Sequence, residues 1–328
     1  MNLDTLRKKR IKRLGIKTST YTGQRRIFFI LDRATRKFHG DLGLWAQYIE
    51  YARQQKAHKK ISKIFTDALR IHPTDAELWI LAAKYALEDH ADMTLARSYM
   101  QRGLRFCKTS KNLWIQYAKL EIIYIAKIAA RQVILGLGQT SDRTEKRDNE
   151  NFDTDADTIA LPQLTGEDVN PSLSEDQQVD ENALETLNST PALSGAIPMA
   201  IFDASMKQFQ NEPSFAKLFF MMVVEFENLP CLQNIINHIV DIQLATSPEN
   251  HQSQICFIRA AVAGCRVDSP EFPRKFRESF TRFKGYPLSG ALATEMIKWM
   301  EPLEKTKGLD PSLQTVFTGL LQRCRDAL

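Results

Sequence analysis

The sequence predicts an all-α protein, an α-solenoid of helix-pair repeats with a long acidic, disordered insertion. Three tryptophans recur at intervals of 34 and 35 residues, a period typical of stacked helical repeats. A small residue precedes each tryptophan by eleven positions, and an arginine precedes each by nine. The three repeated sets are Trp45, Trp79 and Trp114; Ala34, Ala68 and Gly103; and Arg36, Arg70 and Arg105.

The small residues and the tryptophans are predicted to pack where two helices cross. A pair of short helices cannot bury its apolar face alone, so it stacks on its neighbours. At a close crossing one helix must present a small side chain, and a bulky indole fills the adjacent space. The alternative is that the tryptophans are exposed aromatics that bind a ligand. Because they lie on apolar stripes, core packing is the favoured interpretation.

Composition limits the class of protein. No apolar run in the 328 residues approaches the length of a membrane-spanning helix, and the basic residues 7–13 are not followed by the apolar part of a secretory signal. The five cysteines are scattered and include no CxxC pair, which indicates a reducing compartment. We therefore expect no association with a membrane and no disulfide framework.

Charge is distributed unevenly along the chain. Residues 1–138 contain 27 Lys and Arg against 11 Asp and Glu. Residues 139–195 contain 3 against 14, and residues 196–328 contain 14 against 14. The basic first part indicates contact with a polyanion or with an acidic protein surface.

Residues 1–40 are expected to form basic N-terminal helices that lead into the repeats. The opening string LRKKRIKRLG is typical of one or two basic helical turns, and residues 24–37 carry a 3.6-residue apolar pattern. The basic string is consistent with a solvated helix face or a nuclear-import signal, and also with phosphate contact to RNA. The cations expected to contact RNA or an acidic partner are Arg7, Lys8, Lys9, Arg10, Lys12, Arg13, Arg25 and Arg26.

Residues 41–138 are expected to form the repeat array. Apolar stripes predict successive helices, and the helix of Trp79 should begin at an N-cap formed by Thr74 or Asp75. The helix of Trp114 should begin at residues 110–112. A further helix at 129–137 is expected to complete the last pair.

Residues 139–195 are predicted to be an acidic, disordered insertion. The segment is rich in Ser, Thr, Asn and Pro, and Phe152 is its single aromatic residue. Such a segment cannot bury enough apolar surface to offset the entropy lost on ordering. A solvated insertion is the favoured interpretation. The alternative is a competitor that folds back onto the basic first part.

Residues 196–328 are expected to form degenerate helical repeats. Ala204 precedes Phe215 by eleven positions, so these two residues are expected to repeat the contact between a small residue and an aromatic ring. Prolines delimit further helices, predicted at 231–245, 251–264, 271–284, 288–301 and 311–326.

The sequence contains no motif of catalysis or cofactor binding. It has no HExxH, Cys/His cluster, Ser/His/Asp grouping or GKS/GKT string, and its GxG at 136–138 is typical of a helix end. We expect no enzymatic activity, no cofactor, no metal and no small-molecule substrate.

Several strings resemble a known type of repeat. WAQYIEYA (45–52), WILAAKYALE (79–88) and WIQYAKLE (114–121) resemble HAT repeats, the half-a-TPR motif of RNA-processing scaffolds. Longer strings resemble more narrowly the family of the sixth U3 small nucleolar RNA-associated protein. These strings are RKKRIKRLG, GQRRIFFILDRATRKF, RSYMQRGLRFCK, AKLEIIYIAKIAARQVILGL and PMAIFDAS. The resemblance is strong over 1–138 and weak over 196–328.

The resemblance implies a non-enzymatic scaffold of the small-subunit processome in the nucleolus, which supports early cleavage and assembly of the 18S ribosomal RNA precursor. The implied partners are processome proteins and U3 small nucleolar RNA or the ribosomal RNA precursor. Family members carry further helices before the LRKKRIKRLG string, so the helix at 1–14 is expected to lack its pairing partner.

Two other functions stay open on the sequence alone. One is a HAT-repeat scaffold in mRNA splicing or 3′-end processing. A weaker one is a regulator of an associated enzyme, in which the acidic segment 139–195 occupies a basic site.

Overall fold

The computed structural model describes residues 21–134, 193–227, 229–305 and 311–328, together with residue 6 and residues 9–10 and 12–15 near the N-terminus. The insertion predicted at 139–195 lies outside the described residues apart from its last three positions. The chain divides into two compact units, Met1–Leu113 and Trp114–Leu328.

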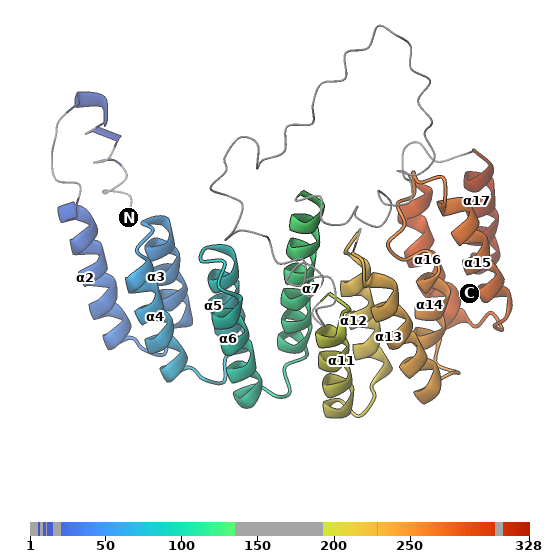
Figure 1. The fold of residues 1–328 in the computed structure, drawn as a ribbon, viewed down its shortest axis with the longest axis horizontal. Helices are drawn as coiled ribbons and strands as arrows, with labels where there is room; N and C mark the ends of the chain where they lie inside the picture. Colours follow the sequence, from blue (N-terminus) through green and yellow to red (C-terminus); the bar gives the residue numbers. More distant parts are fainter. Residues whose placement is uncertain are drawn as a thin grey trace, which may run out of the picture. The chain divides into compact units, whose positions relative to one another are not determined.

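The first unit is a series of helices joined by short connections, α2 to α6 and the start of α7 (Figure 1). Each helix packs on the next, α2 on α3, α3 on α4, α4 on α5 and α5 on α6. Their bounds are Tyr21–Lys37 (α2), Leu42–Gln54 (α3), His58–Ile71 (α4), Ala76–Glu88 (α5), Met93–Phe106 (α6) and Lys111–Ile134 (α7).

The second unit continues the same kind of packing from α11 onward. In it α14 contacts α12, α13, α15 and α16, and α16 packs on α17. The bounds are Ala196–Gln208 (α11), Pro213–Val224 (α12), Leu232–Thr246 (α13), His251–Ala260 (α14), Phe272–Lys284 (α15), Gly290–Glu304 (α16) and Pro311–Arg325 (α17). Among the described residues every long regular element is a helix, which confirms the predicted all-α class and the packed helix pairs of an α-solenoid.

Short polar side chains start several of these helices where the sequence indicated. The Asp41 carboxylate accepts a hydrogen bond from the Leu44 amide at 3.2 Å, and Asp75 accepts one from the Glu77 amide at 2.9 Å. Each bond satisfies an amide that has no partner within its own helix. Of the two predicted N-caps of α5, Asp75 is the one that forms.

The prediction of a separate helix at 129–137 is wrong. Helix α7 runs without a break from Lys111 to Ile134. Residues 122–130 contain neither Gly nor Pro, so nothing in the sequence stops the helix after Glu121. Ser110 does cap its start, because its hydroxyl oxygen lies 3.4 Å from the Leu113 amide nitrogen.

Two of the repeated tryptophans are core residues. Trp45 is 4% exposed and Trp79 is 5% exposed, whereas Trp114 on α7 is half-buried. The indole N–H of Trp45 donates to the His39 carbonyl, and that of Trp79 donates to the Pro73 carbonyl, both at 2.9 Å. Each acceptor lies six positions before its tryptophan, so the connection before the helix is fixed to the indole.

The next repeat contacts the same two carbonyls. Nε2 of His72, at the end of α4, lies 2.6 Å from the His39 oxygen. Sγ of Cys107, at the end of α6, donates to the Pro73 oxygen at 3.5 Å. Each carbonyl therefore contacts both the tryptophan that follows it and the end of a helix in the next repeat. This pair of contacts recurs with the period of the sequence.

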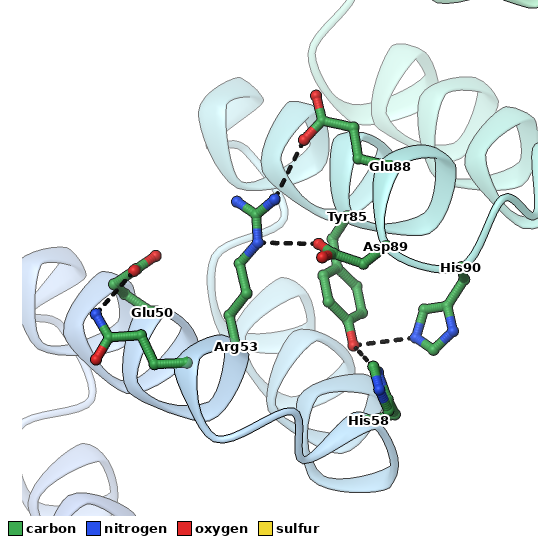
Figure 2. Close-up of polar contacts among 8 residues, drawn as sticks. Glu50, Arg53, His58, Tyr85, Glu88, Asp89 and His90 are labelled. Atoms are coloured by element: carbon green, nitrogen blue, oxygen red, sulfur yellow. Dashed lines mark hydrogen bonds and ion pairs between the residues drawn. The ribbon is translucent and has the colours of Figure 1, made fainter.

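A second group of polar contacts joins α3, α4 and α5 (Figure 2). Arg53 on α3 forms two ion pairs at the end of α5. One is with Glu88, the last residue of α5, at 3.3 Å, and the other is with Asp89, the residue that follows, at 2.9 Å. The Tyr85 hydroxyl lies 3.0 Å from a ring nitrogen of His58 and 3.0 Å from one of His90. The three ion-paired side chains are 29% to 56% exposed, so each pair is expected to contribute at most about 1 kcal/mol to stability.

The small residue Gly103 packs at a helix crossing, but its partner differs from the predicted one. A Cβ at Gly103 would lie 2.9 Å from Cγ of Trp79, so the indole that faces it belongs to the preceding helix, α5. The prediction that Gly103 packs against Trp114, eleven positions later, is therefore wrong. Of the other two small residues, Ala68 is fully buried and Ala34 is half-buried.

The predicted packing role of Ala204 is wrong, because Ala204 is exposed. The small buried residue of α11 is the next one, Ser205, which is 0% exposed and whose hydroxyl donates to the Phe202 carbonyl at 2.6 Å. Phe215 is fully buried and contacts Phe209, with ring centroids 4.7 Å apart. The connection before Phe215 has four residues, as the earlier ones do, but Phe215 is the third residue of its helix whereas each tryptophan is the fourth. An interval of eleven therefore counts back one position too far, to Ala204 instead of Ser205.

The second unit also contains a connection in which a glutamine stands at the position of the repeated tryptophan. The side-chain Nε2 of Gln254 donates to the Pro248 carbonyl, six positions earlier, at 3.4 Å. The indole N–H groups of Trp45 and Trp79 donate to carbonyls at the same interval. Asn250, four positions before Gln254, caps α14 through the Gln252 amide at 2.8 Å. Gln254 therefore takes the place of the tryptophan in this connection.

Candidate binding grooves

A basic groove lies between α2 and α4, over the side chains of Trp45 and Tyr48 on α3. It has a volume of about 540 Å³. Its cations are Arg25 and Arg36 from α2 and Lys60, Lys63 and Arg70 from α4. We call this the α2–α4 groove.

The cations of the α2–α4 groove follow from helix geometry. Lys60, Lys63, Asp67 and Arg70 are spaced by three or four residues, so they lie on one face of α4. The opposite face buries Ile61, Phe65 and Ala68 in the core. The same helix therefore presents one apolar face to the unit and one basic face to solvent.

Part of this positive charge is compensated within the groove. Arg36 pairs with Asp32 at 2.8 Å, and Lys60 lies 4.0 Å from the centroid of the Phe28 ring. Lys63 and Arg70 form no ion pair with any of the residues that the structure describes. These two cations remain available to an anionic partner.

Two aromatic residues add to the chemistry of the groove. Phe29 is 66% exposed at its edge, where its ring can stack on a planar group. Burial raises the pKa of Tyr48 to about 12, with Asp32 adding to the shift and Arg36 opposing it. The Tyr48 hydroxyl is protonated at neutral pH, as a tyrosine with an ordinary pKa also is, and can donate a hydrogen bond.

A second groove follows one repeat later, between α4 and α6, over Trp79 on α5. It has a volume of about 630 Å³ and is more apolar, with Leu95 and Phe106 exposed along it. The Phe106 ring stacks on Trp79 with an angle of 11° and a centroid distance of 6.0 Å. Arg70 lines both grooves, and Arg102 adds a cation to the second.

The predicted contact residues are only partly brought together. Arg25 lines the α2–α4 groove, and Arg26 is exposed beside it without lining it. Lys9, Arg10, Lys12 and Arg13 are exposed in helical conformation, while Arg7 and Lys8 lie outside the described residues.

Sequence reasoning missed Lys60, Lys63 and Arg70 as candidate contacts, since it identifies Arg70 only as a position of the repeat. The signal was present, because the basic residues of α4 recur at helical spacing on the side opposite to its apolar stripe. Without knowing that α2 lies opposite this face, the spacing is also typical of an ordinary solvated helix surface.

Among the described residues, no group of three or more His, Cys, Asp or Glu is placed to hold a metal ion. No helix in the described part of the chain is both long and apolar enough to cross a membrane. The fold and the α2–α4 groove together define a helical-repeat protein that carries a basic groove on its first unit.

Comparison with known proteins gives a narrower relationship. No family model matches the chain. U3 small nucleolar RNA-associated protein 6 of Schizosaccharomyces pombe is 34% identical over 251 residues, which are 74% of this chain and 49% of that protein. The Homo sapiens homologue of that protein is 31% identical over 103 residues, 31% of this chain and 17% of the human protein. The Mus musculus homologue is 32% identical over 108 residues, 33% of this chain and 18% of the mouse protein.

The chain is thus a homologue of the U3 small nucleolar RNA-associated protein 6 proteins, which confirms the resemblance seen in its strings. The match spans about half the length of the S. pombe relative and less than a fifth of the two mammalian ones.

Proposed function

We propose that the chain is a non-enzymatic scaffold of the small-subunit processome in the nucleolus. In this role it supports processing of the ribosomal RNA precursor that depends on U3 small nucleolar RNA, and maturation of 18S ribosomal RNA. The observation that carries the proposal is its homology to proteins named as U3 small nucleolar RNA-associated. The packed helix pairs and the basic grooves fit a protein that acts through its surface.

The α2–α4 groove is the surface we assign to RNA or to acidic partner segments. Arg25, Lys63 and Arg70 give it cations on both walls, and Phe29 offers an exposed ring. Contacts of this type give affinity for a phosphate backbone without reading base sequence. Selection of the correct RNA would then come from the other proteins that the scaffold assembles.

Purification of the tagged chain, followed by sequencing of the bound RNA and mass spectrometry of the bound proteins, tests the function. We expect U3 small nucleolar RNA, precursors of 18S ribosomal RNA and processome proteins. Recovery of spliceosomal or cleavage factors in their place would favour the alternative scaffold in mRNA splicing or 3′-end processing.

The RNA contact is tested by charge reversal in the groove. Lys60, Lys63 and Arg70 are changed together to Glu, and binding of transcribed U3 small nucleolar RNA is measured at several salt concentrations. We expect weaker binding. The plot of log K against log salt should also become shallower, by about one for each phosphate group that the variant no longer binds.

The matched control reverses Arg33, Lys84 and Arg105. These cations are exposed, lie in the same unit and line neither groove. They change the net charge by the same amount. Equal loss of binding in both variants would show that total charge, and not the groove, attracts the RNA.

A further inference from the structure

A groove in the second unit has a composition unlike the basic grooves of the first. It lies among α12, α14, α15 and α16 and the turns that follow α12 and α14, and has a volume of about 370 Å³. Its walls are mainly apolar and include Val224, Val262, Phe272, Trp299 and Leu303. One half-buried arginine, Arg259, is part of its lining.

Arg259 meets no carboxylate among the described residues. Its Nη1 lies 2.8 Å from Sδ of Met221, and its guanidinium lies 5.5 Å from the centroid of the Trp299 ring. A thioether is a weak acceptor, and an aromatic ring attracts the cation without offering an oxygen acceptor. Most of the five donors of Arg259 therefore lack a strong acceptor within the described part of the unit.

Another arginine of the same unit shows that the fold can satisfy such a group. The Arg282 guanidinium also lies over an aromatic ring, that of Phe257, at 4.5 Å. It donates to the Phe257 carbonyl at 2.8 Å and to the Glu278 carboxylate at 2.7 Å. Arg259 resembles Arg282 in lying over an aromatic ring but lacks these acceptors.

The acidic groups nearest to the groove are engaged elsewhere. Glu295 pairs with Lys217 at 2.6 Å and with Lys298 at 3.4 Å. Glu227, at the rim, lies 3.5 Å from Arg266. Burial lowers the pKa of Arg259, and the neighbouring Cys256 and Glu295 only oppose that shift. The cation thus lies in a partly apolar environment without a direct counter-ion.

We propose that the Arg259 groove binds an acidic side chain of a partner protein segment, with the apolar residues beside that side chain packed against Trp299 and Phe272. A carboxylate matches the fork of guanidinium donors and supplies the missing negative charge. The apolar walls favour a peptide that carries hydrophobic neighbours. The site is separate from the basic grooves, and its test does not depend on the proposed function.

A protein segment fits the groove better than RNA does. A polynucleotide is held by a series of cations along its backbone. This groove offers Arg259 and, at its edge, Lys298, while Glu227 lies at its rim. Residues 196–328 also carry no net charge, with 14 basic against 14 acidic residues.

The test compares the binding of two small peptides to the 328-residue chain. The probe is acetyl-Leu-Glu-Leu-amide, and its neutral isostere is acetyl-Leu-Gln-Leu-amide. Binding is followed by NMR of the Met221 methyl group and the Trp299 indole N–H, both of which belong to groove residues. We expect the Glu peptide to shift both signals in a saturable way and to bind about tenfold more tightly than the Gln peptide. Equal affinity of the two peptides would overturn the proposal.

A second experiment replaces the peptide with a uridine tetranucleotide and follows the same two NMR signals. We expect it to leave both signals unchanged at concentrations that saturate the Glu peptide. If it displaces the peptide with similar affinity, the groove is a general anion site and the assignment to a protein segment is wrong.

Variants connect the binding to Arg259. Arg259→Met keeps the length and apolar character of the side chain and should reduce affinity for the Glu peptide about tenfold or more. Arg277→Met, at an exposed arginine of α15 that does not line the groove, is the control and should leave affinity unchanged. An equal loss in both variants would assign the effect to bulk charge. If Arg259→Met does not fold, Arg259→Lys keeps the charge but not the fork, and it should still bind the Glu peptide more weakly than the natural chain does.

Discussion

Gly103 and Trp79 are in such close contact that a methyl group at position 103 would lie 2.9 Å from Cγ of the indole and 3.0 Å from its Cβ. Both atoms are close to the backbone of α5, so they cannot move aside as the end of a flexible side chain could. The distance between α5 and α6 is therefore set by the absence of a side chain at Gly103.

Gly103→Ala should destabilise the first unit for this reason. Alanine favours a helix over glycine by about 1 kcal/mol, but overpacking at a fixed crossing typically costs about 1–3 kcal/mol. We expect a net loss of about 1 kcal/mol, measured as a lower midpoint in urea denaturation.

Gly319→Ala is the matched control for this substitution. Gly319 is an exposed residue of α17 with no neighbouring atom within 4 Å of a Cβ. Alanine there should stabilise by about 0.5–1 kcal/mol. If both substitutions stabilise, the crossing at Gly103 is not close-packed.

Trp79→Ala should cost about 3–5 kcal/mol, the usual range for truncation of a buried tryptophan. The indole is 5% exposed, stacks on Phe106 and donates to the Pro73 carbonyl. Trp79→Phe keeps a ring but removes the donor, so it should cost less, about 1–2 kcal/mol. Thermal denaturation of the full chain measures both effects. A midpoint that hardly moves in Trp79→Ala would show that the residue does not pack in the core.

Ala204→Leu and Ser205→Leu distinguish the predicted from the observed register of α11. Ala204 is exposed, so leucine there should change stability by less than about 0.5 kcal/mol. Ser205 is 0% exposed, so leucine there should cost about 1–3 kcal/mol through overpacking. Urea denaturation of the two variants measures the difference. The opposite order would restore Ala204 as the packing residue.

The sequence predicts the helices well because their signals are local. Asp75, the prolines and the 3.6-residue stripes lie within a few residues of the ends or faces that they define. The five helices predicted after residue 230 agree with α13 to α17 to within about four residues at each end. The one missed continuation, in α7, came from expecting a turn that no Gly or Pro in 122–130 supports.

Contacts between helices were harder to predict, because the period of a repeat does not say which neighbour a residue faces. An interval of eleven assigned Gly103 to Trp114, whereas Gly103 faces Trp79. In α12 the aromatic residue lies one position nearer the start of its helix than the tryptophans do, so the buried position of α11 is Ser205 and not Ala204. The binding grooves depend on the same long-range information, so Lys63 and Arg70 could not be assigned to one groove before α2 was placed opposite α4.

Glu295→Gln should destabilise the second unit in a pH-dependent way. Glu295 pairs with Lys217 at 2.6 Å, and the two side chains are 16% and 22% exposed. Loss of the negative charge leaves a partly buried ammonium group without its partner, which should cost about 1–3 kcal/mol at neutral pH. Glu301→Gln is the control on the same helix. Its pair with Lys305, at 3.4 Å, is more exposed, so the change should be below about 0.5 kcal/mol.

The pH dependence follows from the direction of the shift at Glu295. Burial alone would raise its pKa, but hydrogen bonding and charge interaction with Lys217 and Lys298 more than offset this and lower it. A carboxyl group whose pKa is lower in the folded chain contributes stability above its unfolded pKa of about 4.3, and loses that contribution as the pH falls through the folded value. The stability difference between the natural chain and Glu295→Gln should therefore be largest at about pH 7 and shrink on acidification to about pH 3. Urea denaturation across this range measures it, and a difference that stays constant would show that Glu295 does not act as the charged partner of Lys217.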